Sequence, residues 1–207
     1  MRKYAFIGFG LFAAGLGMKF FHAPFHALIM ISGLLAMLIE NVWYAIHKGK
    51  NKSELFFRIA TTFILTYLLF LVKFYPFSQV PSIAGFLFLI LGVFYSLTTK
   101  STNQHITRFT LIALVLSILV SATVYLIPTD VRYYLFNIKF NHEIETDYRT
   151  WDKYSWFLYV NNKQVEAAQA SERALELVTK TTDEQYLNQI KSHRSKINIR
   201  SWERFNH

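Results

Sequence analysis

The stretch His26-Ala-Leu-Ile-Met-Ile-Ser-Gly-Leu-Leu-Ala-Met-Leu-Ile-Glu40-Asn-Val-Trp-Tyr-Ala-Ile46 decides the fold class of this 207-residue chain. It is an apolar run long enough to cross a bilayer, which takes about 20 mostly apolar residues in a helix. Glu40 lies within the run, and Asn41 follows it directly. A carboxyl group at that depth costs about 2.5 kcal/mol or more to insert, so such groups usually face protein or water and often have a function.

Four more apolar blocks in the first 127 residues are each near the length of one helical crossing. The breaks between the blocks are short, so we expect neighbouring spans to run antiparallel. The first block has no small-residue cleavage site followed by polar sequence, so we expect a retained membrane helix and not a signal peptide. The predicted spans cover about residues 4–21, 26–46, 56–74, 82–98 and 109–127.

The charges divide the chain at about residue 127. Residues 1–127 hold ten Lys/Arg against two acids, whereas residues 128–207 hold twelve Lys/Arg and eleven acids. Bases that flank apolar spans are what membrane orientation requires, so the net charge of +9 does not point to nucleic acid. The bases that gather at the N-terminus and at the second and fourth breaks are Arg2, Lys3, Lys48, Lys50, Lys52, Arg58, Lys100 and Arg108.

This distribution predicts a bacterial inner-membrane protein with a cytoplasmic N-terminus and a periplasmic tail. If the first block lies in the interface instead of crossing, the tail becomes cytoplasmic. The chain has no cysteine, which excludes disulfides and thiol chemistry. We find no glycine-rich phosphate loop and no convincing catalytic pair, so we expect no enzyme activity, no cofactor and no metal.

Small residues line the first block, and Gly10 and Ala14 are four apart on one helix face. Small residues let helices approach closely in lipid. We therefore expect this block to pack tightly, either inside the bundle or in a homo-oligomer.

Two turns of the apolar half look alike. Lys19-Phe-Phe-His-Ala-Pro24 and Lys73-Phe-Tyr-Pro76 each place Lys and aromatic residues at the end of a span and then break at Pro. Lys side chains reach the headgroups, aromatic rings lie at that level, and Pro ends the helix. Spans one and two are therefore expected to repeat as spans three and four, in the same orientation.

The first of these turns resembles the GldL family, inner-membrane proteins of the gliding and type 9 secretion machinery of Bacteroidota. The family turn reads Phe-Lys-Ile-x-His-Trp-Pro-Gly, which Lys19, His22 and Pro24 match, and Gly33 follows at a similar distance. The resemblance implies that Glu40 is the counterpart of the family's membrane-embedded Glu, which is implicated in proton-driven motion. Glu40 lies about one helical turn further along than the family motif places that Glu.

The tail has the pattern of amphipathic helices. Residues 147–159 carry aromatic side chains at three-to-four spacing, residues 165–178 are good helix formers, and a third helix is expected from about 181 to 200. Residues 128–146 are interpreted as a juxtamembrane helix, followed by the helical domain at 147–207. The first two tail helices resemble one tetratricopeptide unit at positions Trp151, Tyr154, Ser155, Leu158, Ala167 and Ala174.

These observations predict an all-α polytopic protein that serves as an interaction or assembly subunit of an envelope complex. Its partners would be membrane or periplasmic proteins and the lipid bilayer, and a homo-oligomer is an open alternative. A second hypothesis is a proton- or ion-coupled subunit that uses Glu40 and Asn41, and a third is a pore-forming defence effector. The exposed residues expected to dock a partner are Tyr154, Tyr159, Gln164 and Arg173.

Overall fold

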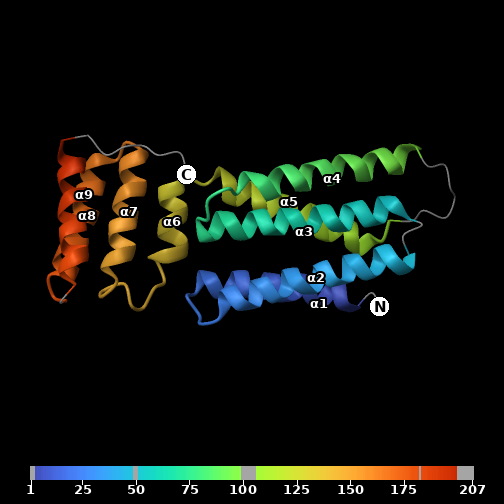
Figure 1. Ribbon diagram of the computed structural model, residues 1–207, viewed down its shortest axis with the longest axis horizontal. Coiled ribbons are helices and arrows are strands. Elements are labelled where there is room, and N and C mark those ends of the chain that lie inside the picture. The colour runs from blue at the N-terminus through green and yellow to red at the C-terminus, as the bar shows by residue number, and fades with distance from the viewer. Residues whose placement is uncertain (1–2, 49–50, 99–105, 182, 200–207) are drawn as a thin grey trace. The chain divides into compact units, whose positions relative to one another are not determined.

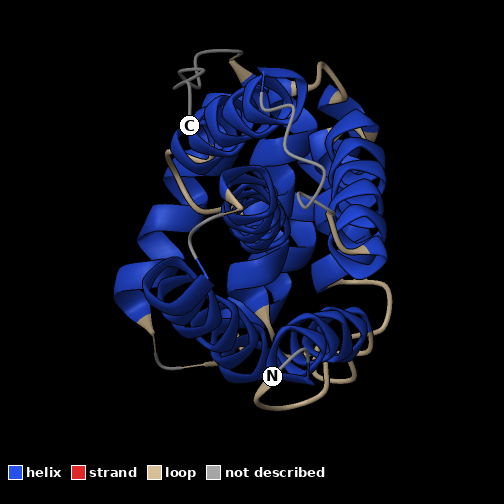
Figure 2. Cartoon of the chain, turned by 90° about the vertical axis from the view of Figure 1, so that its right-hand side faces the viewer, coloured by secondary structure: helices blue, strands red, loops and turns tan. Residues whose placement is uncertain are grey.

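The computed structural model describes residues 3–48, 51–98, 106–181 and 183–199, and within these residues all regular structure is helical (Figure 2). The chain divides into two compact units. Met1–Lys19 and Ala23–Leu126 form the membrane unit, and Phe20–His22 and Ile127–His207 form the tail unit. Arg2, Lys50 and Lys100, three of the bases used to predict orientation, lie outside the described residues.

The membrane unit consists of five helices (Figure 1). Four of them are long and apolar enough to cross a membrane, in agreement with four of the five predicted spans. The first helix, of 18 residues, is not among these four. The helices are α1 (Lys3–Phe20), α2 (His26–Lys48), α3 (Lys52–Lys73), α4 (Gln79–Thr98) and α5 (Arg108–Leu126).

Helices α1 and α2 pack closely through glycine. A Cβ atom added to Gly33 of α2 would lie 2.6 Å from the carbonyl oxygen of Gly8 and 2.7 Å from the amide nitrogen of Phe12, both in α1. The face of α1 that packs on α2 is therefore the one with Gly8, whereas Gly10 and Ala14 are exposed and Gly10 has open space around it. The expected close packing is present, but on a different face from the one that the Gly10 and Ala14 spacing suggested.

The two similar turns share one backbone conformation. Each has a non-glycine residue with positive φ two positions before the proline and another one position after it. The amide of the residue before each proline also bonds the carbonyl five residues back, Ala23 to Met18 and Tyr75 to Phe70. Non-glycine residues rarely adopt positive φ, so four such residues in matching places are a strong likeness. The four residues are His22 (54°), Phe25 (62°), Phe74 (56°) and Phe77 (62°).

The likeness extends into the helices. Pro24 and Pro76 are 52 positions apart, and so are Gly33 and Gly85. Gly33 approaches Phe12 of α1, and Gly85 approaches Ile64 of α3, which is again 52 positions from Phe12. The hairpins α1–α2 and α3–α4 therefore have the same register.

Helix α3 is the centre of the membrane unit and contacts α2, α4 and α5. It begins at Lys52 because the Asn51 side chain accepts a hydrogen bond from the Glu54 amide and caps the helix. Half of its 18-residue apolar stretch is buried, a larger share than in the other candidate spans. Its core contacts with α5 involve Phe57, Ala60, Ile64 and Leu114.

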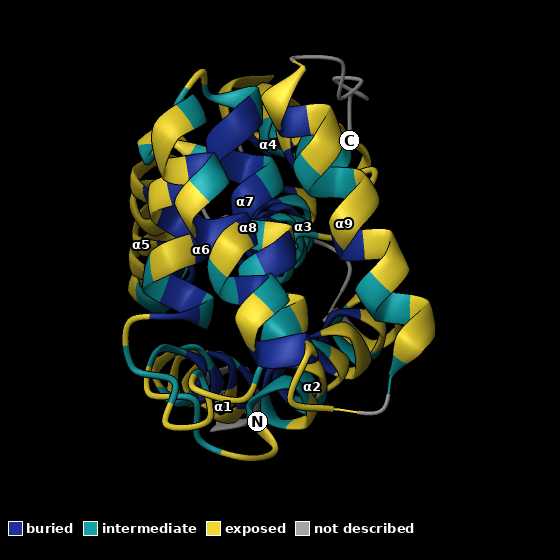
Figure 3. Cartoon of the chain, turned by 90° about the vertical axis from the view of Figure 1, so that its left-hand side faces the viewer, coloured by how far each residue is buried: buried dark blue, intermediate teal, exposed yellow. Residues whose placement is uncertain are grey.

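The tail unit contains α6 (Thr129–Asn137), α7 (Tyr148–Val160), α8 (Gln164–Val178) and α9 (Glu184–Asn198). Asp147 caps α7 and Asp183 caps α9, each accepting a hydrogen bond from a backbone amide in the first turn. Buried alanines let α8 pack closely on its neighbours α7 and α9, whereas most of α9 is exposed or partly exposed (Figure 3). The alanines are Ala167, Ala170 and Ala174.

Helix α6 packs on α7 within the tail unit. The buried carboxylate of Asp130 accepts hydrogen bonds from Asn161, at 3.0 Å, and from the Lys163 ammonium, at 2.6 Å. The Tyr133 ring is buried against Phe157. The start of α6 is thereby tied to the turn between α7 and α8.

Candidate functional site: a buried carboxylate and guanidinium network

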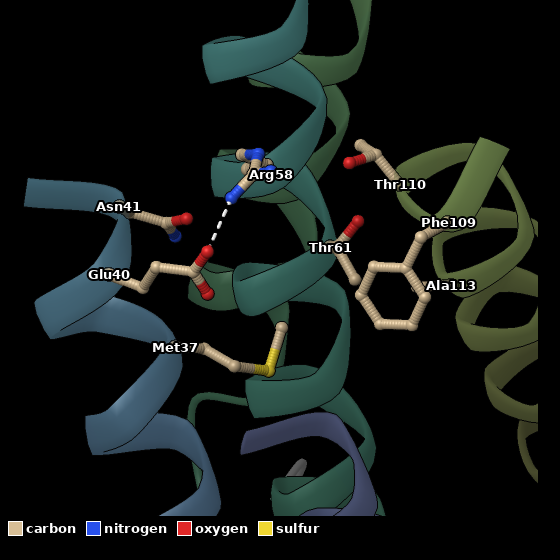
Figure 4. Close-up of a pocket in the computed structure, with 8 residues that line it drawn as sticks. All are labelled: Met37, Glu40, Asn41, Arg58, Thr61, Phe109, Thr110 and Ala113. Atoms are coloured by element: carbon tan, nitrogen blue, oxygen red, sulfur yellow. Dashed lines mark hydrogen bonds and ion pairs between the residues drawn. The ribbon is translucent and has the colours of Figure 1, made fainter. Parts of the chain in front are cut away.

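Glu40 is buried in the membrane unit and binds Arg58 of the neighbouring helix (Figure 4). Arg58 Nη1 donates to Glu40 Oε1 at 2.8 Å. Arg58 Nε also donates to Glu54 Oε1 at 2.7 Å, one helical turn away within α3. The two carboxylates of the apolar half of the chain therefore meet at one guanidinium.

Glu54 extends the network to α5. Its side chain is only 1% exposed. Besides Arg58 it accepts the Thr107 amide at 2.9 Å, the Thr107 hydroxyl at 3.0 Å and the Thr110 hydroxyl at 2.7 Å. A buried carboxylate with this many donors is stabilised in place. It holds the start of α5 against the start of α3.

Two further contacts of α2 with α3 adjoin the network. The Asn41 amide nitrogen donates to the Thr62 hydroxyl at 2.9 Å. The Arg58 guanidinium lies 4.6 Å from the ring centre of Tyr44, in cation–π contact. Glu40 and Asn41, predicted together as candidates for ion coupling, thus both bind α3.

A small cavity of about 20 Å³ adjoins the ion pair, enough for one water molecule. Figure 4 shows Glu40 of α2 and Arg58 of α3 pointing toward each other, with Phe109 on α5. The network contains two carboxyl groups and one guanidinium, so it carries a net charge of −1 when both carboxyls are ionised. The lining residues are Met37, Glu40, Asn41, Arg58, Thr61, Phe109, Thr110 and Ala113.

Sequence reasoning singled out Glu40 but not its partners. Arg58 served only as an orientation marker, and Glu54 was not considered a site residue. The signal for the Glu54–Arg58 contact was present, because residues four apart face each other on a helix. The Glu40–Arg58 contact joins separate helices, and no local spacing encodes it.

The residues of the outer-turn motif lie at the other end of α2 and α3. Lys73 Nζ is 2.7 Å from His26 Nε2, so the second turn contacts the first. Lys19 is buried, and His22 and Pro24 form the turn that precedes α2. None of these residues belongs to the Glu40 network.

The four predicted docking residues of the tail do not form one exposed surface. Tyr159 is 5% exposed and belongs to the tail core, which corrects its assignment as a docking residue. Tyr154 is partly buried among aromatic rings, including Tyr133. Arg173 binds Glu145 and Glu176, and Gln164 is partly exposed at the start of α8.

A partly buried histidine contact in the tail has no counterpart among the residues predicted from the sequence. His193 Nδ1 of α9 lies 3.0 Å from both carboxylate oxygens of Asp152 in α7. The contact joins two helices of the tail unit. Among the described residues, no three His, Cys, Asp or Glu side chains come together in a way that could hold a metal ion.

Comparisons of the chain with protein-family models, with curated proteins and with solved structures found no match. The resemblance of residues 19–40 to the GldL family stays a prediction from sequence.

Proposed function

We propose that this protein is a membrane-anchored interaction subunit of a bacterial envelope complex. The observation that carries the proposal is the tail unit, a compact helical module next in sequence to the apolar helices. The tail has two apolar clusters of its own, one around Leu158 and Ala167 and one around Ala174 and Ile190. A module with its own core supports docking of a partner protein, helix against helix.

The start of α8 is the part of the tail best suited to docking. Val165 is a large apolar side chain that is 70% exposed, and Gln164 precedes it. Lys163 binds Asp130 of α6, which fixes this end of α8. Gln164 and Val165 therefore replace Tyr159 in the proposed docking surface. The likeness of α7 and α8 to one tetratricopeptide unit fits such a role, since these repeats present helical docking surfaces.

In the proposed topology, α1 crosses the membrane as a fifth span. Its contact with α2 supports this, because Gly8 of α1 lies against Met37 of α2. In this antiparallel register the start of α1 lies opposite Val42, within the last two turns of α2, so α1 extends along most of a helix long enough to cross. The N-terminus would be cytoplasmic and the tail periplasmic, by the distribution of basic residues. The inner membrane of a bacterium is the proposed location.

Co-purification from native cells in a mild detergent tests the docking proposal. The full-length protein should retain a stoichiometric partner, and Val165→Glu should release it because a charge enters an apolar contact. Lys180→Glu, at an exposed residue just beyond the other end of α8, serves as the control and should retain the partner. A partner that survives both Val165→Glu and deletion of residues 147–200 would overturn the proposal.

A second candidate function, proton or ion coupling through Glu40, is favoured by one observation. The Glu40–Arg58–Glu54 network has one carboxyl more than it has cations, and a water-sized cavity adjoins it. The proposed relation to the GldL family points the same way. Glu40→Gln that leaves assembly intact but abolishes proton uptake by proteoliposomes would support coupling, whereas unchanged uptake would exclude it.

A further inference from the structure

A second polar cluster lies at the end of the membrane unit that carries the two proline turns, and it is cationic. The turn before α2 and the end of α3 lie at the same end of the unit (Figure 1). Lys73 is the last residue of α3, and His26 is the first residue of α2. The Nζ atom of Lys73 lies 2.7 Å from Nε2 of His26. Lys19 is close enough to both to interact with them electrostatically.

The hydrogen bonds decide the state of His26. Its Nδ1 lies 2.9 Å from the Ala23 carbonyl oxygen, which can only accept, so Nδ1 carries the proton. Lys73 carries no acceptor, so its ammonium donates to Nε2, which must then be the unprotonated nitrogen. His26 is therefore neutral: it orients Lys73 but does not balance its charge.

The carboxylates of the membrane unit lie far from this cluster. Glu40 is 14 residues from His26 along α2, and Glu54 is 19 residues from Lys73 along α3, about 21 and 28 Å at 1.5 Å per residue. Both carboxylates bind Arg58. Two ammonium groups close to each other repel, and an anion between them would stabilise the arrangement.

In the proposed topology the cluster would also lie at the depth of lipid headgroups. His26 and Lys73 are terminal residues of two candidate spans of 22 residues each, long enough to reach the headgroup region. Phe25 and Phe77, on the two turns, are 74% and 76% exposed, as expected for rings at the membrane surface. Lys73 donates one of its three N–H groups to His26 and has two left for a ligand.

We propose that Lys19, Lys73 and the first turn of α2 bind a phosphate group, the headgroup phosphate of a membrane phospholipid or free phosphate. A phosphate oxygen accepts from each ammonium, and the amide end of α2 favours its negative charge. His26 is a positioning residue that directs the Lys73 ammonium. The lipid chains would run along the exposed apolar faces of the spans.

Native mass spectrometry of the full-length protein in mild detergent tests the site, with phosphatidylglycerol as the added lipid. We expect Lys19→Gln/Lys73→Gln to weaken lipid binding by about a hundredfold, since each of the two lost charge-assisted bonds contributes about tenfold. The matched control is Lys52→Gln/Arg108→Gln, two exposed cations at the other end of α3 and α5. The control should keep the wild-type affinity.

Two further measurements separate the sources of phosphate and guard against misfolding. If free phosphate is the ligand, inorganic phosphate raises the melting temperature of lipid-free wild type more than chloride does at equal ionic strength. If only the phospholipid is the ligand, that shift is absent while lipid binding is lost in the double variant. Lys19→Arg/Lys73→Arg should retain binding. Equal affinity of wild type and the glutamine variant for both lipid and phosphate would overturn the proposal, and so would loss of binding in the arginine variant with helix content unchanged.

Discussion

One guanidinium between two carboxylates balances only half of their charge when both are ionised. Arg58 is in that position, and hydroxyl and amide donors from α5 supply the rest of the stabilisation at Glu54. Glu40 has fewer protein donors than Glu54 and lies at the cavity. The network is therefore asymmetric, with Glu54 held by more donors than Glu40.

Replacement of Arg58 should be more damaging than replacement of Glu40. Arg58→Met leaves two carboxyls without their cation, which for a buried ion pair costs about 3–5 kcal/mol. Glu40→Gln leaves the Arg58–Glu54 pair in place, so we expect a smaller loss. Thermal unfolding in detergent measures both, with the exposed Arg108→Met as the control. Glu40→Gln/Glu54→Gln/Arg58→Met should recover much of the loss, and failure to do so would show that charge is not the cause.

At the scale of single residues, the sequence identified Glu40 and Asn41 because polar groups in an apolar run are conspicuous. It could not identify their partners, because Arg58 and Thr62 reach them across a helix interface that depends on the packing of the two hairpins. Tyr159 was wrongly assigned to the surface for a related reason. An aromatic residue at helical spacing fits a core or a docking face equally well, and the packing of α8 decides it.

Asp183 makes the stability of the tail depend on pH. The backbone amide of Tyr186, then the hydroxyl of Tyr148 and the guanidinium of Arg149, bind its carboxylate and lower its pKa in the folded state. A lowered folded-state pKa means that the stabilisation is present above the pKa of the unfolded chain, about 4, and is lost as the pH falls through the folded-state value.

Asp183→Asn isolates this effect, because Asn caps helices about as well as Asp but does not titrate. We expect the variant to be less stable than wild type at pH 7, and the difference to shrink as the pH falls below about 4 and to vanish once it is below the folded-state pKa of Asp183. Hydrogen exchange of the α9 amides as a function of pH measures it. Glu166→Gln, at an exposed carboxylate of α8, should show no comparable change. A difference between wild type and Asp183→Asn that is constant with pH would contradict this account.

At the scale of whole helices, glycine decides how closely α1 and α2 approach each other. Gly33→Ala places a Cβ against backbone atoms of α1, which cannot yield without moving the helix. We expect a loss of about 1–3 kcal/mol, as for overpacked cores. Gly10→Ala, on the open face of α1, should be neutral or slightly stabilising, because Ala favours helix over Gly. Unfolding in detergent compares them, and equal losses would show that helix propensity, not packing, controls both.

The sequence predicted the helices well and their ends less well. The predicted span at 56–74 begins four residues later than α3, because polar residues such as those at 52–54 are typical of a loop. In the structure Asn51 caps the helix and Glu54 is buried, so polarity at this helix start reflects internal bonding and not exposure to water. Likewise α4 begins at Gln79 and includes Pro81, which the first turn of a helix tolerates.

For the whole molecule, three candidate spans separate Lys52 from the tail, so these parts should lie on opposite sides of the membrane. The chain has no cysteine, so single-cysteine variants can be labelled without background. With an impermeant maleimide on intact cells, Lys180→Cys should react and Lys52→Cys should not. An N-terminal tag protected together with Lys52→Cys would place α1 across the membrane, and labelling of both cysteines would refute the topology.

The common register of the two hairpins raises the question of whether a third hairpin could pack on the second as the second packs on the first. The first hairpin is fastened to the second by polar contacts of α2, among them the buried Asn41. The position 52 residues later is Val93, which is exposed on α4 and has no polar group to offer a third hairpin. Gly92, in the place of Glu40, offers no carboxylate either. A third hairpin could therefore not pack on α4 through the polar contacts that join the first hairpin to the second.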